Sequence, residues 1–200
     1  ERTMSMRVHH GSTIVLAMLC CLSVLSARQQ PAANGPGTTG FRGDFLKQVA
    51  EVEKKVEDLA RAVPEEKYLW RPMDGVRSVS EVYMHIAGTN YLMASMIGIK
   101  SPEGLERDME KNITVKSHVL EMLRSSFQHI RNAIISTPDS NLEKPAKFFG
   151  EETTVRDVMF RAALHMHEHL GQSIAYARMN RIVPPWTAAE QAREKAKAKQ

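Results

Sequence analysis

The pattern of apolar positions along the chain predicts a mostly helical protein. Between residues 45 and 63, apolar side chains recur at steps of three and four, which is the spacing of one face of an α-helix. The positions in this first stripe are Phe45, Val49, Val52, Val56, Leu59 and Val63. Either Gly43 or Asp44 can begin the helix, and Pro64 ends it.

Two further helices are expected in the middle of the chain. The sequence Ser-Val-Ser-Glu at 78–81 has the form of a capping box, so the second helix begins at Ser78 and ends near Gly98. The apolar stripe of this helix consists of Val82, His85, Thr89, Leu92 and Met96. A third helix spans about 114–137 and is closed by Pro138.

The fourth helix begins after Thr154, which can cap it together with Asp157, and continues to about Asn180. The connections 101–111 and 139–152 are polar, and the first of them has room for one helical turn. No stretch alternates with period two for long enough to predict a strand. Four amphipathic helices with these connections predict an all-α fold, a four-helix bundle.

The first 27 residues do not share this pattern and are typical of an export signal. A weakly basic start around Arg7 precedes the mainly apolar run 14–25, and Ser26-Ala27 offers small residues for cleavage. The run fits the ~7–15 residues of a signal-peptide core and is shorter than the ~20 that span a bilayer. We therefore expect a signal peptide at 1–27 and an exported protein, periplasmic or secreted. A retained membrane anchor and an ordinary buried helix are the alternatives.

Three segments follow the predicted signal peptide. Residues 28–40 are rich in Pro, Gly, Asn and Thr and predict a flexible spacer, and 41–186 form the helical domain. The tail 187–200 is charged, has no apolar face and is expected to be solvated and frayed. The net charge of +4 is modest, and the chain has no basic cluster with interleaved aromatic residues, so we expect no nucleic-acid partner. We also expect no membrane contact after signal cleavage.

Both cysteines, Cys20 and Cys21, lie in the predicted signal peptide. The mature domain therefore has no disulfide, no thiolate ligand and no cysteine nucleophile. Histidine is left as the obvious metal ligand.

Histidines at a helical spacing predict a metal site. His165 and His169 are four residues apart and lie on one side of the fourth helix, whereas His167 points nearly opposite. Two histidines at this spacing can chelate one ion from a single helix, and His85 on the second helix is the natural third ligand. The competing interpretation is that these are hydrogen-bonded core histidines.

Other residues on these helices are expected to be structural. His118 and His129 share a side of the third helix with polar neighbours, among them Ser126, and we predict that they lie on the surface, as does His167. A helical glycine costs about 1 kcal/mol relative to alanine unless it permits close packing, and we expect packing to be the role of Gly171.

The sequence resembles the DinB-like (YfiT-like) superfamily of metal-binding four-helix bundles over roughly 41–186. The segments that carry the resemblance are Trp70-Arg71-Pro72, residues 78–87 around His85, residues 165–172 (HMHEHLGQ), residues 176–180 (YARMN) and Pro184-Pro185. In that family a histidine in the second helix is followed by His-x-x-x-His, a Gly-Gln pair, a Tyr-x-Arg and a Pro-Pro.

The resemblance implies that His85, His165 and His169 hold one divalent metal ion, usually zinc or nickel. Relatives include thiol-dependent S-transferases, whose thiol cofactors are cytoplasmic, so an exported member is not expected to use them. We expect a metal-dependent hydrolase or transferase acting on a small molecule. The alternative is a non-catalytic metal- or ligand-binding bundle in the cell envelope, because Gln172, Tyr176 and Thr89 offer no strong base near the ion. A homodimer is left open.

Overall fold

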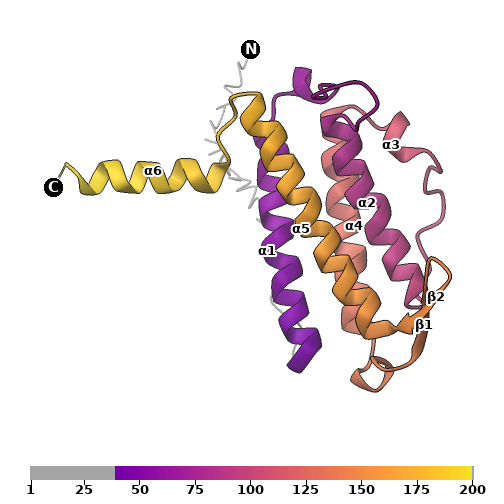
Figure 1. Ribbon diagram of the computed structural model, residues 1–200. Coiled ribbons are helices and arrows are strands. Elements are labelled where there is room, and N and C mark those ends of the chain that lie inside the picture. Colours follow the sequence, from indigo (N-terminus) through magenta and orange to yellow (C-terminus); the bar gives the residue numbers. More distant parts are fainter. Residues whose placement is uncertain (1–38, 200) are drawn as a thin grey trace, which may run out of the picture. The chain divides into compact units, whose positions relative to one another are not determined.

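The computed structural model describes residues 39–199, so the predicted signal peptide and most of the predicted spacer lie outside the described residues. The four long helices that the sequence predicts are α1 (Gly40–Ala62), α2 (Val79–Met96), α4 (Lys116–Ser136) and α5 (Val155–Met179). The helices α1 and α2 each pack against both α4 and α5, which makes a four-helix bundle (Figure 1). The prediction of an all-α fold is confirmed.

Shorter elements connect and extend these helices. They are the 3₁₀ turns η1 (Glu65–Lys67) and η2 (Asp139–Asn141), the short helix α3 (Met109–Asn112), the strands β1 (Pro145–Phe148) and β2 (Glu151–Thr154), and the helix α6 (Pro185–Lys197). Among residues 39–199, no helix combines the length and the apolar character needed to cross a membrane.

The connection between α2 and α4 runs back along the bundle, so that these two helices point in the same direction (Figure 1). Lys116, at the start of α4, donates a hydrogen bond to the carbonyl of Val63 (2.6 Å), just after α1 ends. Arg42, near the start of α1, pairs with Asp139 (2.6 Å), just after α4 ends. The helix α4 is therefore antiparallel to α1, and the returning segment brings α3 against α2.

The two helices that carry the predicted metal ligands begin where the sequence indicates. The Ser78 hydroxyl accepts a hydrogen bond from the backbone N–H of Glu81 (3.3 Å), and the Glu81 carboxylate accepts one from the N–H of Ser78 (2.7 Å). These two bonds form the predicted capping box of α2. The Thr154 hydroxyl caps α5 by accepting from the N–H of Asp157 (3.2 Å).

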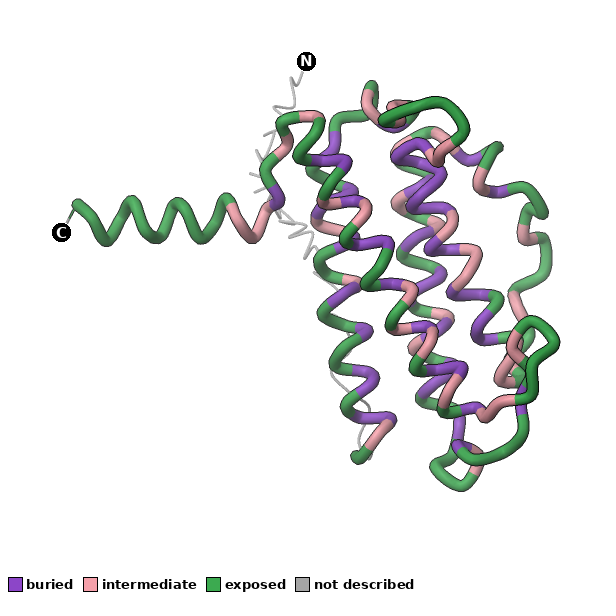
Figure 2. Tube along the Cα trace, viewed as in Figure 1, coloured by how far each residue is buried: buried purple, intermediate pink, exposed green. Residues whose placement is uncertain are grey.

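The core lies between the four long helices (Figure 2). The predicted stripe of α1 faces it, and Val49, Val52 and Val56 are fully buried. The helix α2 is buried on most of its sides, so its core face is wider than the predicted stripe. His85 and Thr89 lie at the margin of that face, and Leu92 is exposed.

The polar segment 139–152 is not a plain loop, and this part of the sequence prediction is wrong. It contains η2 and most of a β-hairpin, in which Phe148 pairs with Glu151. Phe149 and Gly150 form the two-residue turn with φ angles of 48° and 93°, the left-handed values that tight hairpins require. The strands have only four residues each, and β2 is wholly polar, so they carry no recognisable alternation.

The tail after the bundle forms α6, whereas the sequence predicts a frayed segment. Its Ala, Lys, Glu and Gln residues are strong helix formers, and Pro185 occupies the first helical position, which proline favours. No residue of α6 is buried, so the expectation that this segment is solvated agrees with the structure.

Gly171 does not serve close packing, contrary to the prediction from sequence. A Cβ atom at this position would meet nothing within 4 Å. We expect Gly171→Ala to raise the free energy of unfolding by about 1 kcal/mol, because alanine is the better helix former. Thermal denaturation measures this as a rise of roughly 2–4 °C. A fall in melting temperature would show that the glycine is needed for the backbone.

Candidate metal centre

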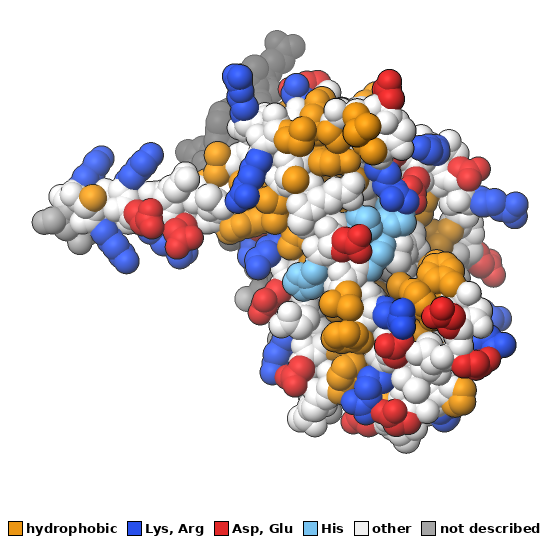
Figure 3. All heavy atoms as spheres, viewed as in Figure 1, with side chains coloured by type: hydrophobic (Ala, Val, Ile, Leu, Met, Phe, Trp, Pro, Cys, Tyr) orange, Lys and Arg blue, Asp and Glu red, His pale blue; other side chains and the backbone are white. Residues whose placement is uncertain are grey.

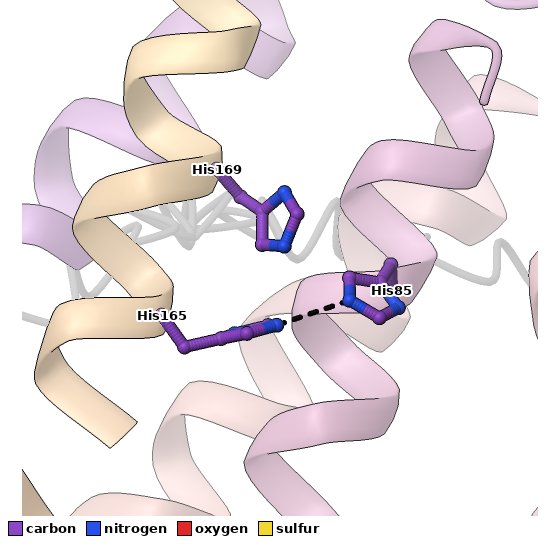
Figure 4. Close-up of side chains that lie close together, drawn as sticks. All are labelled: His85, His165 and His169. Atoms are coloured by element: carbon purple, nitrogen blue, oxygen red, sulfur yellow. Dashed lines mark hydrogen bonds between the residues drawn. The ribbon is translucent and has the colours of Figure 1, made fainter. Parts of the chain in front are cut away.

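Three histidines converge from two helices of the bundle. His165 and His169 lie on successive turns of α5, and His85 faces them from α2 (Figure 4). The Nε2 atoms of His85 and His165 are 3.0 Å apart. Each of the three rings offers one nitrogen, and these three nitrogens all lie within 4.8 Å of one another. The structure therefore brings together the three ligands predicted from the sequence.

The spacing of these nitrogens fits a single metal ion. Zinc binds histidine nitrogen at about 2.0–2.1 Å, so tetrahedral ligand atoms lie roughly 3.3 Å apart. The 3.0 Å separation of the Nε2 atoms of His85 and His165 is close to this value. Two nitrogens that converge in this way need either a shared proton or a shared cation, and a third imidazole on the same spot favours the cation.

Hydrogen bonds on the outer side of two rings fix which nitrogen faces the cluster. The Nδ1 atom of His85 lies 2.7 Å from the Glu110 carboxylate, and Nδ1 of His169 lies 2.8 Å from the side-chain oxygen of Gln172. Both partners are acceptors, so each Nδ1 carries the proton and each Nε2 keeps its lone pair. Metal-binding histidines commonly have such outer partners.

Burial keeps the α5 histidines neutral. It lowers the pKa of His165 to about 3, and the neighbouring His169 and His85 add to the effect. Burial also lowers the pKa of His169, although the hydrogen bond with Gln172 opposes the shift. A neutral imidazole is the form that binds a metal ion, so at neutral pH these two rings need not lose a proton to do so.

Glu110, unlike the two neutral histidines of α5, remains charged. Burial raises the pKa of its carboxyl group, but hydrogen bonds from Arg77 (2.9 Å) and His85 outweigh this, and the pKa lies below its usual value. The sequence prediction missed this residue. Glu110 is one of several acidic residues in the polar connection 101–111, and only the returning path of that connection brings it to His85.

The remaining histidines of the described chain lie outside this cluster. His167 and His118 are exposed, as predicted. His129 is half-buried instead, with its ring 5.2 Å from that of Tyr91, and Ser126 is fully buried and accepts a hydrogen bond from Asn90. The prediction of a polar surface at these two positions is wrong, because α2 packs on this side of α4.

A groove adjoins the centre on the side of α3. Its volume is about 660 Å³, and His85 and Glu110 are among its lining residues. The apolar part of its wall comes from Met84, Tyr91, Leu92, Leu105 and Met109. The size lies within the ~300–1,000 Å³ that is usual for small-molecule sites.

Histidine side chains reach the surface on the face of the molecule drawn in Figure 3, with hydrophobic side chains above and below them. Exposed apolar residues of α5 include Phe160 and Leu164, which are 52% and 53% exposed. The centre is thus reachable from outside the bundle, and His169 is its most buried ligand, with 8% exposed.

The fold and the centre define a helical bundle with a three-histidine cluster between two of its helices. The sequence model of the DinB superfamily matches residues 48–173, and the chain belongs to this superfamily. The resemblance inferred from the sequence motifs is therefore confirmed. A comparison with curated proteins gives no match.

Solved structures of other proteins have the same fold. A DinB-like protein from Bacillus cereus has a TM-score of 0.63 and 17% identity, over 70% of this chain and 93% of that one. A DinB-like protein from Bacillus subtilis has a TM-score of 0.57 and 19% identity, over 70% and 93%. A conserved protein from Enterococcus faecalis has a TM-score of 0.57 and 13% identity, over 70% and 97%. At these identities the likeness concerns the fold alone.

Proposed function

We propose that the protein binds one divalent metal ion, zinc or nickel, through the Nε2 atoms of His85, His165 and His169. We further propose that it uses the ion as a hydrolase or transferase on a small molecule. The observation that carries the proposal is the convergence of three imidazole nitrogens within 4.8 Å, two of them with a hydrogen-bonded acceptor on the outer side. Three histidine ligands leave a coordination position for substrate, as in catalytic zinc sites.

When bound, the ion would supply Lewis acidity, which polarises a substrate oxygen or lowers the pKa of a water molecule. The protein's own residues would position and enclose the reacting molecule. Glu110 and Gln172 hold the rings of His85 and His169 in one tautomer. The groove beside His85 offers space for a small substrate with an apolar part, which Leu92, Leu105 and Met109 would contact.

A second candidate function is a non-catalytic bundle, in which the ion fastens α2 to α5. One observation favours it. The carboxylate that bonds a histidine of the centre, Glu110, also bonds Arg77, so it is engaged and not free to act as a general base. Turnover of a substrate distinguishes the two candidates.

We also propose that the protein is exported and works in the cell envelope or outside the cell. The support is the apolar run 14–25 followed by Ser26-Ala27. Mass analysis of the N-terminus, on protein secreted by a bacterial host, should place the cleavage shortly after Ala27. An intact leader on protein from the cytoplasmic fraction would contradict export.

The metal is tested on the full chain after removal of bound ions with a chelator. We expect one Zn²⁺ or Ni²⁺ per chain after desalting, and a rise in melting temperature of roughly 5–10 °C at a hundredfold excess over Kd. Mg²⁺ should produce neither effect, because it prefers oxygen ligands. Retention of no ion would contradict the proposed function.

The loaded protein is then offered ester, amide, phosphoester and thiol-transfer substrates. Turnover that disappears with the chelator and returns with the ion would support the enzyme. A melting shift without turnover across the panel would support the metal-binding bundle.

A further inference from the structure

The outer hydrogen bonds of the metal centre meet at one residue, Arg77. On one side, the Arg77 Nε–H donates to Glu110 (2.9 Å), whose other carboxylate oxygen accepts from His85 Nδ1 (2.7 Å). On the other side, the backbone carbonyl of Arg77 accepts from the hydroxyl of Tyr176 (3.1 Å). That hydroxyl accepts from the Gln172 amide (3.1 Å), and Gln172 accepts from His169 Nδ1 (2.8 Å). A continuous chain therefore joins two ligands from different helices on the side away from the cluster.

Arg77 has a backbone that is well fixed for this purpose. It directly precedes Ser78, the N-cap of α2, whose two capping bonds hold the start of the helix. The next residue, Val79, donates its backbone N–H to the carbonyl of Trp70 (3.0 Å), and the Trp70 ring makes an edge contact with Tyr176 (5.4 Å between centroids). The capping bonds thus hold the carbonyl of Arg77 in place, and the Trp70 ring holds the side chain of Tyr176.

Glu110, by contrast, has little to hold it apart from Arg77 and His85. It lies on α3, a helix of only four residues, and its side chain is 32% exposed. Charge-assisted hydrogen bonds are stronger than neutral ones and hold a carboxylate in one orientation. The Arg77 guanidinium supplies the restraint on the oxygen that His85 does not use.

We propose that Arg77 is a positioning residue, which keeps the Nε2 atoms of His85 and His169 directed at the cluster by anchoring both outer chains. The inference rests on the proposed metal binding for its purpose, but the anchoring is a property of the metal-free protein. The competing explanation is that the pair of Arg77 with Glu110 only ties α3 to the bundle. Exposed ion pairs contribute little to stability. If the pair only tied α3 to the bundle, its loss should therefore leave the Zn²⁺ affinity and the tautomer of His85 unchanged.

Arg71 provides a matched control. Like Arg77, it pairs with a carboxylate, that of Glu81 (3.4 Å), and it also donates to the backbone carbonyl of Val76 (2.9 Å). Its side chain is 35% exposed, against 38% for Arg77. It reaches no histidine partner, so Arg71→Gln removes a similar arginine without touching either outer chain.

The experiment compares Arg77→Gln, Arg77→Lys, Tyr176→Phe and Arg71→Gln in the full chain. We expect Arg77→Gln to weaken Zn²⁺ affinity up to about tenfold, in competition with a chelating indicator, because Glu110 stays in place but loses its restraint, whereas loss of an outer partner itself costs about 10–100-fold. Arg77→Lys should recover part of the loss, since lysine can still donate to Glu110. Arg71→Gln should keep the affinity of the parent chain, because Arg71 bonds neither Glu110 nor Gln172.

The second readout needs no metal. Imidazole ¹⁵N shifts of the metal-free protein should show His85 as a single Nδ1–H tautomer, and Arg77→Gln should convert it to a mixture. Tyr176→Phe should alter the signal of His169 and leave that of His85 unchanged. If the parent chain retains no Zn²⁺, the proposed function fails while these shifts still decide the inference. The inference would be overturned by an unchanged His85 signal in Arg77→Gln, by an unchanged His169 signal in Tyr176→Phe, or by equal Zn²⁺ affinities of Arg77→Gln and Arg71→Gln.

Discussion

Replacing His165 with alanine is expected to abolish stoichiometric binding of Zn²⁺. Its Nε2 atom is 3.0 Å from that of His85, so the two nitrogens converge on one point, and without His165 two imidazoles remain for an ion that prefers three or four ligands. The affinity should fall by at least about 100-fold, the upper end of what loss of an outer partner costs. Metal content after desalting and the Zn²⁺-induced melting shift measure the loss.

The neighbouring His167 gives the matched control for this prediction. It lies on the same helix two residues away but is exposed and takes no part in the cluster. His167→Ala should keep one ion per chain and the full melting shift, whereas His85→Ala and His169→Ala should behave like His165→Ala. Loss of the ion in His167→Ala together with its retention in His165→Ala would refute the assigned ligands.

The ligands themselves could be predicted because helical periodicity is a local property. A spacing of four residues places His165 and His169 on one side of α5 wherever that helix packs. His85 required one more assumption, that α2 turns its stripe toward α5, and the capping box at Ser78 fixes the start from which that register is counted.

The outer partners could not be predicted to the same extent. Gln172 is one helical turn from His169, so its position follows from the same periodicity. Glu110 is 25 residues from His85 in sequence and reaches it only because the connection after α2 runs back along the bundle. No local pattern in the polar segment 101–111 marks the direction of that path or distinguishes Glu110 from Glu106.

Prediction of the fold failed where the signal was short or where intrinsic propensity decided the outcome. The hairpin depends on Phe149 and Gly150 taking left-handed conformations, and a bulky aromatic residue is an unusual choice for that region. The tail has no apolar face, but a segment rich in Ala, Lys and Glu can be helical without burying any residue. The tail therefore forms a helix without any contribution from burial.

Replacing Phe127 with alanine should produce the largest loss of stability among the changes considered. Phe127 is fully buried on α4 and belongs to the hydrophobic core between the long helices. Truncating a buried phenylalanine removes its apolar contacts and leaves a cavity, which costs about 3–5 kcal/mol. For a domain of this size the melting temperature of the metal-free protein should fall by roughly 6–20 °C.

Replacing Phe160 with alanine is the matched control, because it removes the same side chain from an exposed position. Phe160 lies on α5 with 52% of its surface exposed, so Phe160→Ala leaves no enclosed cavity and should change the melting temperature by a few degrees at most. Both variants should still bind Zn²⁺ where they are folded, because neither residue contributes to the cluster or to its outer hydrogen bonds. Equal melting temperatures for the two variants would contradict the burial of Phe127 in the core between the helices, because only an enclosed side chain leaves a cavity when it is truncated.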